Sequence, residues 1–361
     1  MLRLPHDPSR MADRRAVGAW LLVLTAMVFG AVVLGGLTRL TGSGLSMVDW
    51  RPITGWLPPL SAGEWQQVFE LYKQTPQFRH VNFDMDLEGF KSIFWLEYVH
   101  RLWGRLIGVA FALPFAWFLL RRRIERPLIA PIALAFVLGG LQGVIGWLMV
   151  ASGLVDAPDV SQYRLVAHLG AAIVIYVYLL WLGLTLREGK PADVVPSLRP
   201  LARATTAVAG LVVLTMLAGG FVAGLDAGLV YNTFPLMDGG LAPGGYFAGP
   251  LAAFEDAGTA QFNHRLLATV TVMAVVWLWF RARAVPAGGV FFDLLLGAVA
   301  VQFALGIATL LAQVPVALGA LHQALAFLVL ALVVAARHRL ATPRIRTATA
   351  APSGIGQGRT V

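Results

Sequence analysis

Four histidines fall inside long apolar segments of this sequence, where an ionisable side chain is costly and usually has a function. They are His100, His168, His264 and His322. One pair lies in the first half of the chain and one in the second, each on two separate segments that can face each other across a helical core. Two facing imidazoles form a natural axial pair for haem iron, so the pattern predicts two haem sites.

Two other interpretations of these histidines stay open at this stage. A single intramembrane histidine often only packs and forms hydrogen bonds. Zinc or copper is the competing metal, but the chain has no cysteine and few intramembrane carboxylates to complete a tetrahedral site. Haem brings its own equatorial nitrogens, and small residues near the histidines would leave room for a flat macrocycle or, equally, for close helix packing. These are Gly104, Gly108, Gly170, Ala171 and Ala172.

A carboxylate accompanies only the first pair. Glu97 precedes His100 by nearly one helical turn and therefore shares its face, whereas Gln261 stands at the corresponding position before His264. Glu97 is a candidate proton acceptor or charge stabiliser beside a reacting centre. The alternative is a glutamate favoured by the helix dipole near an N-terminus. The asymmetry indicates one reactive half and one half that only holds haem.

Three arginines lie at the same margin of the apolar segments as these histidines. They are Arg101, Arg105 and Arg265. Their guanidinium groups could bind haem propionates through charge-assisted hydrogen bonds, or they could extend to the membrane interface.

The composition indicates a polytopic membrane protein. Of the 361 residues 58% are hydrophobic and 13% charged, and the mean hydropathy is +0.71. The net charge of +9 does not indicate nucleic-acid binding, because the basic residues cluster in short joints between apolar runs. Eight segments are long enough to cross a bilayer. They are 16–38, 93–120, 128–151, 163–186, 203–225, 260–280, 290–312 and 317–337.

Arginine and lysine concentrate at the two termini and in the joints after the even-numbered segments. This bias predicts that both termini are cytoplasmic and that loops 39–92 and 226–259 face outward. All four histidines lie in the first two turns of segments that run inward, so the haem sites should lie toward the periplasmic side. The short basic N-terminus favours a bacterial inner membrane over an organelle.

The chain also repeats itself. Gly35-Gly36 matches Gly219-Gly220, and further matches in the same order are His100 with His264, Gln142 with Gln302, and His168 with His322. We therefore expect an all-α polytopic fold of eight transmembrane helices arranged as two pseudo-symmetric four-helix bundles. The expected parts are a cytoplasmic tip 1–15, an N-terminal bundle 16–186, a linker 187–202, a C-terminal bundle 203–337 and a disordered tail 338–361.

Several long motifs resemble the haem A synthase family of cytochrome oxidase assembly enzymes. They are GGLTRLTGSGLSMVDWRPITGWLPPL at 35–60, FELYKQTPQF at 69–78, IFWLEYVHRLWGRLIG at 93–108, LQGVIGWLMVASGL at 141–154 and FNHRLLA at 262–268. The resemblance runs from about residue 16 to residue 337. The absence of cysteine places the chain nearest the cysteine-free branch of that family.

The resemblance implies an enzyme that oxidises the C8 methyl group of haem O to the formyl group of haem A by successive hydroxylations. It implies that Glu97 is catalytic and that His100 and His168 bind the substrate haem. His264 and His322 would ligate the iron of a resident haem b, which would pass electrons. The implied partners are haem O synthase, cytochrome oxidase assembly factors and an electron donor whose identity the sequence leaves open.

Two other functions are weighed against this one. A di-haem electron-transfer cytochrome would need haems near both membrane faces, and a haem carrier without chemistry would not need Glu97. One further expectation concerns the first outer loop, where residues 61–74 have the start signal and spacing of a short amphipathic helix that could cover a site.

Overall fold

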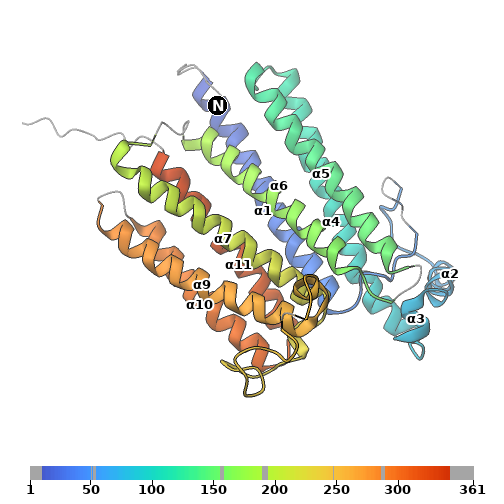
Figure 1. Cartoon of the computed structure of the whole chain (residues 1–361). Helices are drawn as coiled ribbons and strands as arrows, with labels where there is room; N and C mark the ends of the chain where they lie inside the picture. Colours follow the sequence, from blue (N-terminus) through green and yellow to red (C-terminus); the bar gives the residue numbers. More distant parts are fainter. Residues whose placement is uncertain are drawn as a thin grey trace, which may run out of the picture.

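The computed structural model describes residues 10–49, 51, 54–154, 158–188, 194–246, 248–285 and 289–341. Eight helices in this part of the chain are long and apolar enough to cross a membrane, which confirms the predicted all-α fold (Figure 1). Each coincides with one predicted segment. They are α1 (Met11–Leu40), α4 (Leu87–Leu120), α5 (Arg126–Ser152), α6 (Gln162–Glu188), α7 (Arg199–Gly224), α9 (Ala257–Arg283), α10 (Val290–Leu311) and α11 (Val316–Ala341).

The same neighbour relationships recur among the helices of the two halves. Helix α1 packs against α4 and α6 as α7 packs against α9 and α11, and α5 packs against α6 as α10 packs against α11. The halves meet where α6 and α1 contact α7 and α11. The division into two pseudo-symmetric bundles stays a prediction. Of the expected parts, residues 1–9, 189–193 and 342–361 of the tip, linker and tail lie outside the described residues.

Helix α1 packs against three other membrane-crossing helices, α4, α6 and α11. Its residues Val17, Leu21, Leu24 and Val28 are buried and recur every three or four positions, which places them on one helical face. They join the main hydrophobic core with residues of α6 and α11. This packing sets the position of the glycines near the C-terminal end of α1, which matter below.

The loop between α1 and α4 contains two short helices, α2 (Ala62–Lys73) and α3 (Pro76–His80). The predicted helix at 61–74 is confirmed: the Ser61 hydroxyl accepts from the Glu64 N–H, and the Glu64 carboxylate accepts from the Ser61 N–H. Phe69 and Tyr72 of α2 pack with Phe90 of α4 in an aromatic cluster of their own. Helix α2 therefore packs against the N-terminal part of α4 (Figure 1).

Helix α4 begins six residues earlier than the hydrophobic pattern predicts. The side chain of Asp86 accepts a hydrogen bond from the Gly89 N–H and caps the helix, so a polar turn precedes the apolar run. With 34 residues α4 is about 50 Å long, well beyond the roughly 30 Å of a bilayer core. The prediction that every histidine lies in the first two turns of its helix is therefore wrong for His100, because the added turns stand before it.

Candidate functional site

Each of the four intramembrane histidines lies directly against a glycine of a neighbouring helix. The pairs are His100 with Gly35, His168 with Gly146, His264 with Gly219, and His322 with Gly306. A Cβ at any of these glycines would stand 2.8 to 3.2 Å from the Cε1 atom of the ring, closer than side chains normally approach. The glycines thus leave the space that the imidazoles occupy, and they match between the halves in the order of the repeat.

The two histidines of the second pair lie close to each other. The ring centroids of His264 and His322 are 6.4 Å apart, and the ring planes are nearly perpendicular at 87°. This separation is compatible with a haem iron that His264 and His322 would hold between them.

One hydrogen bond fixes the protonation of His264. Its Nδ1 lies 3.1 Å from the carbonyl oxygen of Thr215, which can only accept. Nδ1 must therefore carry the proton, and Nε2 of the neutral ring is left with its lone pair, as a metal ligand requires.

The first pair is also brought together. His100 and His168 are close enough to interact electrostatically, and the Nδ1 atom of His168 is buried without a hydrogen-bond partner in the described structure. Gln142 donates to the backbone carbonyl of His168 (2.9 Å), and its repeat partner Gln302 donates to that of His322 (3.0 Å). The glutamines thus hold α5 to α6 and α10 to α11 at the level of the histidines.

Protein side chains alone do not form a metal site in the described residues. No group of three or more histidine, cysteine, aspartate or glutamate side chains within them is placed to hold a metal ion. Pairs of histidines with small residues beside them suit a ligand that brings its own equatorial donors, so the residues present fit haem better than zinc or copper.

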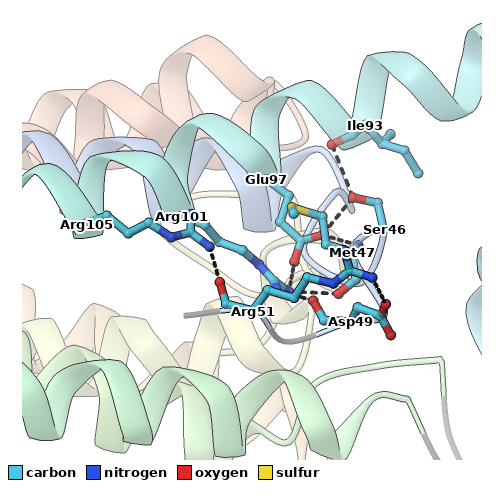
Figure 2. A network of polar contacts seen from close by, with 8 residues as sticks. All are labelled: Ser46, Met47, Asp49, Arg51, Ile93, Glu97, Arg101 and Arg105. Atoms are coloured by element: carbon cyan, nitrogen blue, oxygen red, sulfur yellow. Dashed lines mark hydrogen bonds and ion pairs between the residues drawn. The ribbon is translucent and has the colours of Figure 1, made fainter. Parts of the chain in front are cut away.

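Glu97 is buried and held by three donors (Figure 2). Its Oε2 accepts from the Ser46 hydroxyl (2.7 Å) and the Met47 N–H (2.9 Å), and its Oε1 accepts from Nη2 of Arg101. Arg101 also donates to the carbonyl oxygens of Met47 (2.9 Å) and Asp49 (3.4 Å). The carboxylate and the guanidinium together hold the loop after α1 against α4.

Gln261 repeats this arrangement in the second half with the opposite hydrogen-bond polarity. Its Oε1 accepts from Arg265 (3.0 Å), but its Nε2 donates to the carbonyl oxygens of Ala227 (2.7 Å) and Tyr231 (3.2 Å). Arg265 donates to the carbonyls of Tyr231 (2.7 Å) and Thr233 (3.0 Å). The Oε2 atom of Glu97 therefore faces two donors, whereas the Nε2 atom of Gln261 faces two acceptors.

Arg101, Arg105 and Arg265 all donate hydrogen bonds to loop backbone. Besides the contacts of Arg101 and Arg265, Nη2 of Arg105 donates to the carbonyl oxygen of Arg51 (2.8 Å). The Nε atom of Arg265 is buried without a hydrogen-bond partner among the described residues. The sequence did not predict that these arginines donate hydrogen bonds to loop carbonyl groups. That they bind haem propionates stays a prediction.

Helix α1 connects the two halves beside the histidines. Next to Gly35, which faces His100, Gly36 faces Gln323, the neighbour of His322 on α11. The side chain of Gln323 donates to the carbonyl of Val32 on α1 (3.0 Å). The symmetric position to Gln323 is an apolar leucine, Leu169, which lies against Gly220. One of the two equivalent contacts between the halves is therefore polar.

Sequence reasoning missed Ser46, Met47 and Gln323. The repeat carried a usable signal for all three, because each aligns with a different residue type in the other half. At the offset that relates the glycine pairs Ser46 aligns with Val230 and Met47 with Tyr231, and at the offset that relates His168 to His322 Gln323 aligns with Leu169.

Comparisons with known proteins agree with one another. Residues 18–334 match the COX15-CtaA family model, described as cytochrome oxidase assembly protein. The chain is 48% identical over 338 residues to the "Heme A synthase" of Nitrosospira multiformis, covering 92% of this chain and 95% of that protein. It is 48% identical over 336 residues to that of Parvibaculum lavamentivorans (91% and 96%), and 46% identical over 341 residues to that of Caulobacter vibrioides (92% and 98%).

Proposed function

This chain belongs to the COX15-CtaA family of cytochrome oxidase assembly proteins, and we infer that it is a haem A synthase. It is then an oxidoreductase that converts haem O to haem A, and haem O is its substrate. The eight candidate membrane spans make it a multi-pass membrane protein.

We assign the two halves different tasks. Residues 16–186 would bind the substrate haem through His100 and His168, and residues 203–337 would hold a resident haem b through His264 and His322. One observation supports this division most strongly: Glu97 is the only acidic side chain among the buried residues of the described structure, and its counterpart Gln261 is equally buried at 2% exposure but uncharged. The alternatives of a di-haem cytochrome and a carrier give no reason for that difference.

The task of Glu97 follows from its partners. Three of the roughly four acceptor positions of the carboxylate are filled, all by donors that stabilise its negative charge. Oxidation of a methyl carbon withdraws electrons from it, and the carboxylate end of the Glu97–Arg101 ion pair, when turned toward such a centre, stabilises it. A proton could be accepted only at the position left on Oε1. The contacts therefore favour Glu97 as a charge stabiliser that also positions the loop.

The C-terminal half holds His264 and His322 in positions that suit the ligands of a redox cofactor. A haem b between His264 and His322 would supply a route for electrons to the first half. The chain's own contribution is to fix the His264 tautomer through the Thr215 carbonyl and to keep both rings against glycines.

We extend the proposal to orientation and partners. The basic residues gather where α1 begins and α11 ends, which supports cytoplasmic termini and haem sites toward the periplasmic side of a bacterial inner membrane. Haem O synthase, oxidase assembly factors and an unidentified electron donor are the expected partners.

Extraction of the haems from the purified wild-type protein tests the function. Haem b together with haem O or haem A is the expected result when haem O is available to the cells. A protein that contains only haem b, and whose expression in a strain that makes haem O yields no haem A, would overturn the assignment.

A further inference from the structure

A pocket of about 390 Å³ lies between α7 and α11, at the opposite end of these helices from the histidines. Three arginines line it, Arg199 and Arg203 from the start of α7 and Arg337 from the end of α11. The remaining lining residues are Val194, Ala202 and Thr206. Neither pair of histidines nor the Glu97 network reaches this end of the fold.

The arginines of this pocket are not neutralised by the described residues. No described carboxylate lies within ion-pair distance of Arg199, Arg203 or Arg337, whereas Arg339 pairs with Glu188 at 3.3 Å. The Nη1 atom of Arg337 is buried without a hydrogen-bond partner in the described structure. A buried guanidinium N–H without an acceptor is unfavourable, so the pocket is suited to an anionic ligand.

The Arg337 side chain is nevertheless fixed in direction. Its Nε donates to the hydroxyl of Thr206 (3.0 Å), and that hydroxyl donates to the carbonyl of Ala202 (3.0 Å). This arrangement leaves the outer nitrogens of the guanidinium for a ligand. The N–H groups in the first turn of α7 add to the positive potential at the same place.

We propose that this pocket binds the phosphate group of an anionic phospholipid. Arginines recognise phosphate through paired, charge-assisted hydrogen bonds. A free phosphate ion shares this chemistry, but the position favours a lipid. Arg203 and Arg337 lie about one turn from the ends of two membrane-crossing helices, at the depth of lipid headgroups. Val194 and Ala202 offer apolar contact for the first methylene groups of the acyl chains.

The test uses the full-length protein with its haem, purified after reconstitution into vesicles of phosphatidylcholine and phosphatidylglycerol in equal parts. Native mass spectrometry then measures the lipid that remains bound. We expect phosphatidylglycerol to be retained in preference. The triple variant Arg199→Gln, Arg203→Gln, Arg337→Gln should lose that preference by about tenfold or more.

The matched control removes the same charge from the same side of the membrane helices through Arg15→Gln, Arg121→Gln and Arg281→Gln, and it should retain the lipid. Equal loss in both triple variants would reduce the effect to general surface charge and overturn the proposal. Displacement of the lipid by inorganic phosphate at comparable concentration would identify a soluble anion instead, which also overturns it. If the pocket variant fails to fold, a wild type that retains both lipids equally is sufficient to reject the site.

Discussion

Gln261 holds Arg265 by the same atoms through which Glu97 holds Arg101: in each pair Oε1 accepts from Nη2 of an arginine one helical turn later. The two turns differ in the partners of the other terminal atom, which is Oε2 in Glu97 and Nε2 in Gln261. At Glu97 it meets the hydrogen-bond donors Ser46 and Met47, and at Gln261 it meets carbonyl oxygens. The surrounding loops have therefore adapted to a charge in one half and to its absence in the other.

Replacement of Glu97 by glutamine should stop the reaction while the protein still holds haem b. The amide keeps an acceptor for Arg101, but its N–H₂ group would face the Met47 N–H, and the negative charge is lost. We expect haem O to accumulate and haem A formation to fall about 100-fold or more. The measurement is the ratio of the two haems extracted from cells expressing Glu97→Gln.

The control for this variant is the reverse change in the other half, Gln261→Glu. A carboxylate there would face two carbonyl oxygens, so haem b content and stability should fall. Unchanged haem A production by Glu97→Gln would remove the catalytic role from this residue.

Replacement of His264 by alanine should abolish low-spin haem b. Axial ligation by two histidines produces a characteristic absorbance, and the ring is placed for it by Thr215. The measurement is the reduced-minus-oxidised spectrum of the purified variant. His80→Ala, an exposed histidine of α3, serves as control and should keep the full signal. A His264→Ala protein with the wild-type low-spin absorbance would disprove the ligand assignment.

A methyl group at Gly306 should displace His322. The added Cβ would stand 2.8 Å from Cε1 of the ring, so we expect Gly306→Ala to weaken haem b binding and to shift its spectrum. Gly297 lies on the same helix, where an added Cβ would meet no neighbouring atom within 4 Å, and Gly297→Ala should be neutral or stabilise α10 by up to about 1 kcal/mol. Equal behaviour of the two variants in spectrum and thermal stability would show that the glycine does not shape the site.

The contact between Gly36 and Gln323 should couple the two halves. A Cβ at Gly36 would overlap the Gln323 amide, and the displaced side chain would lose its hydrogen bond to Val32, at a cost of about 1 kcal/mol. Gly36→Ala should lower the temperature at which haem is released. In a protein that already carries Gln323→Ala, adding Gly36→Ala should lower that temperature by much less. A double variant whose loss equals the sum of the single losses would mean that the two residues act independently.

The sequence was sufficient for the eight helices and for the proximity of His264 and His322, because apolar length and the ordered repeat are properties of the chain itself. It misplaced the start of α4, where a polar turn is capped by Asp86 outside the apolar run. It also could not assign a role to Arg101, because the carbonyl groups that Arg101 binds belong to a loop without periodicity, and loop backbone positions depend on tertiary contacts.

Two neighbouring glycines of α1 contact different halves of the molecule. Gly35 lies against His100 in the first half, and Gly36 lies against Gln323 in the second. This has an evolutionary consequence. A repeated protein whose copies were self-contained could let one copy decay or be lost after the other had specialised. Here a substitution at Gly36 on the first helix would clash with Gln323, nearly three hundred positions later. The two repeats are therefore constrained to change together, even though their residues at the Glu97 and Gln261 positions differ.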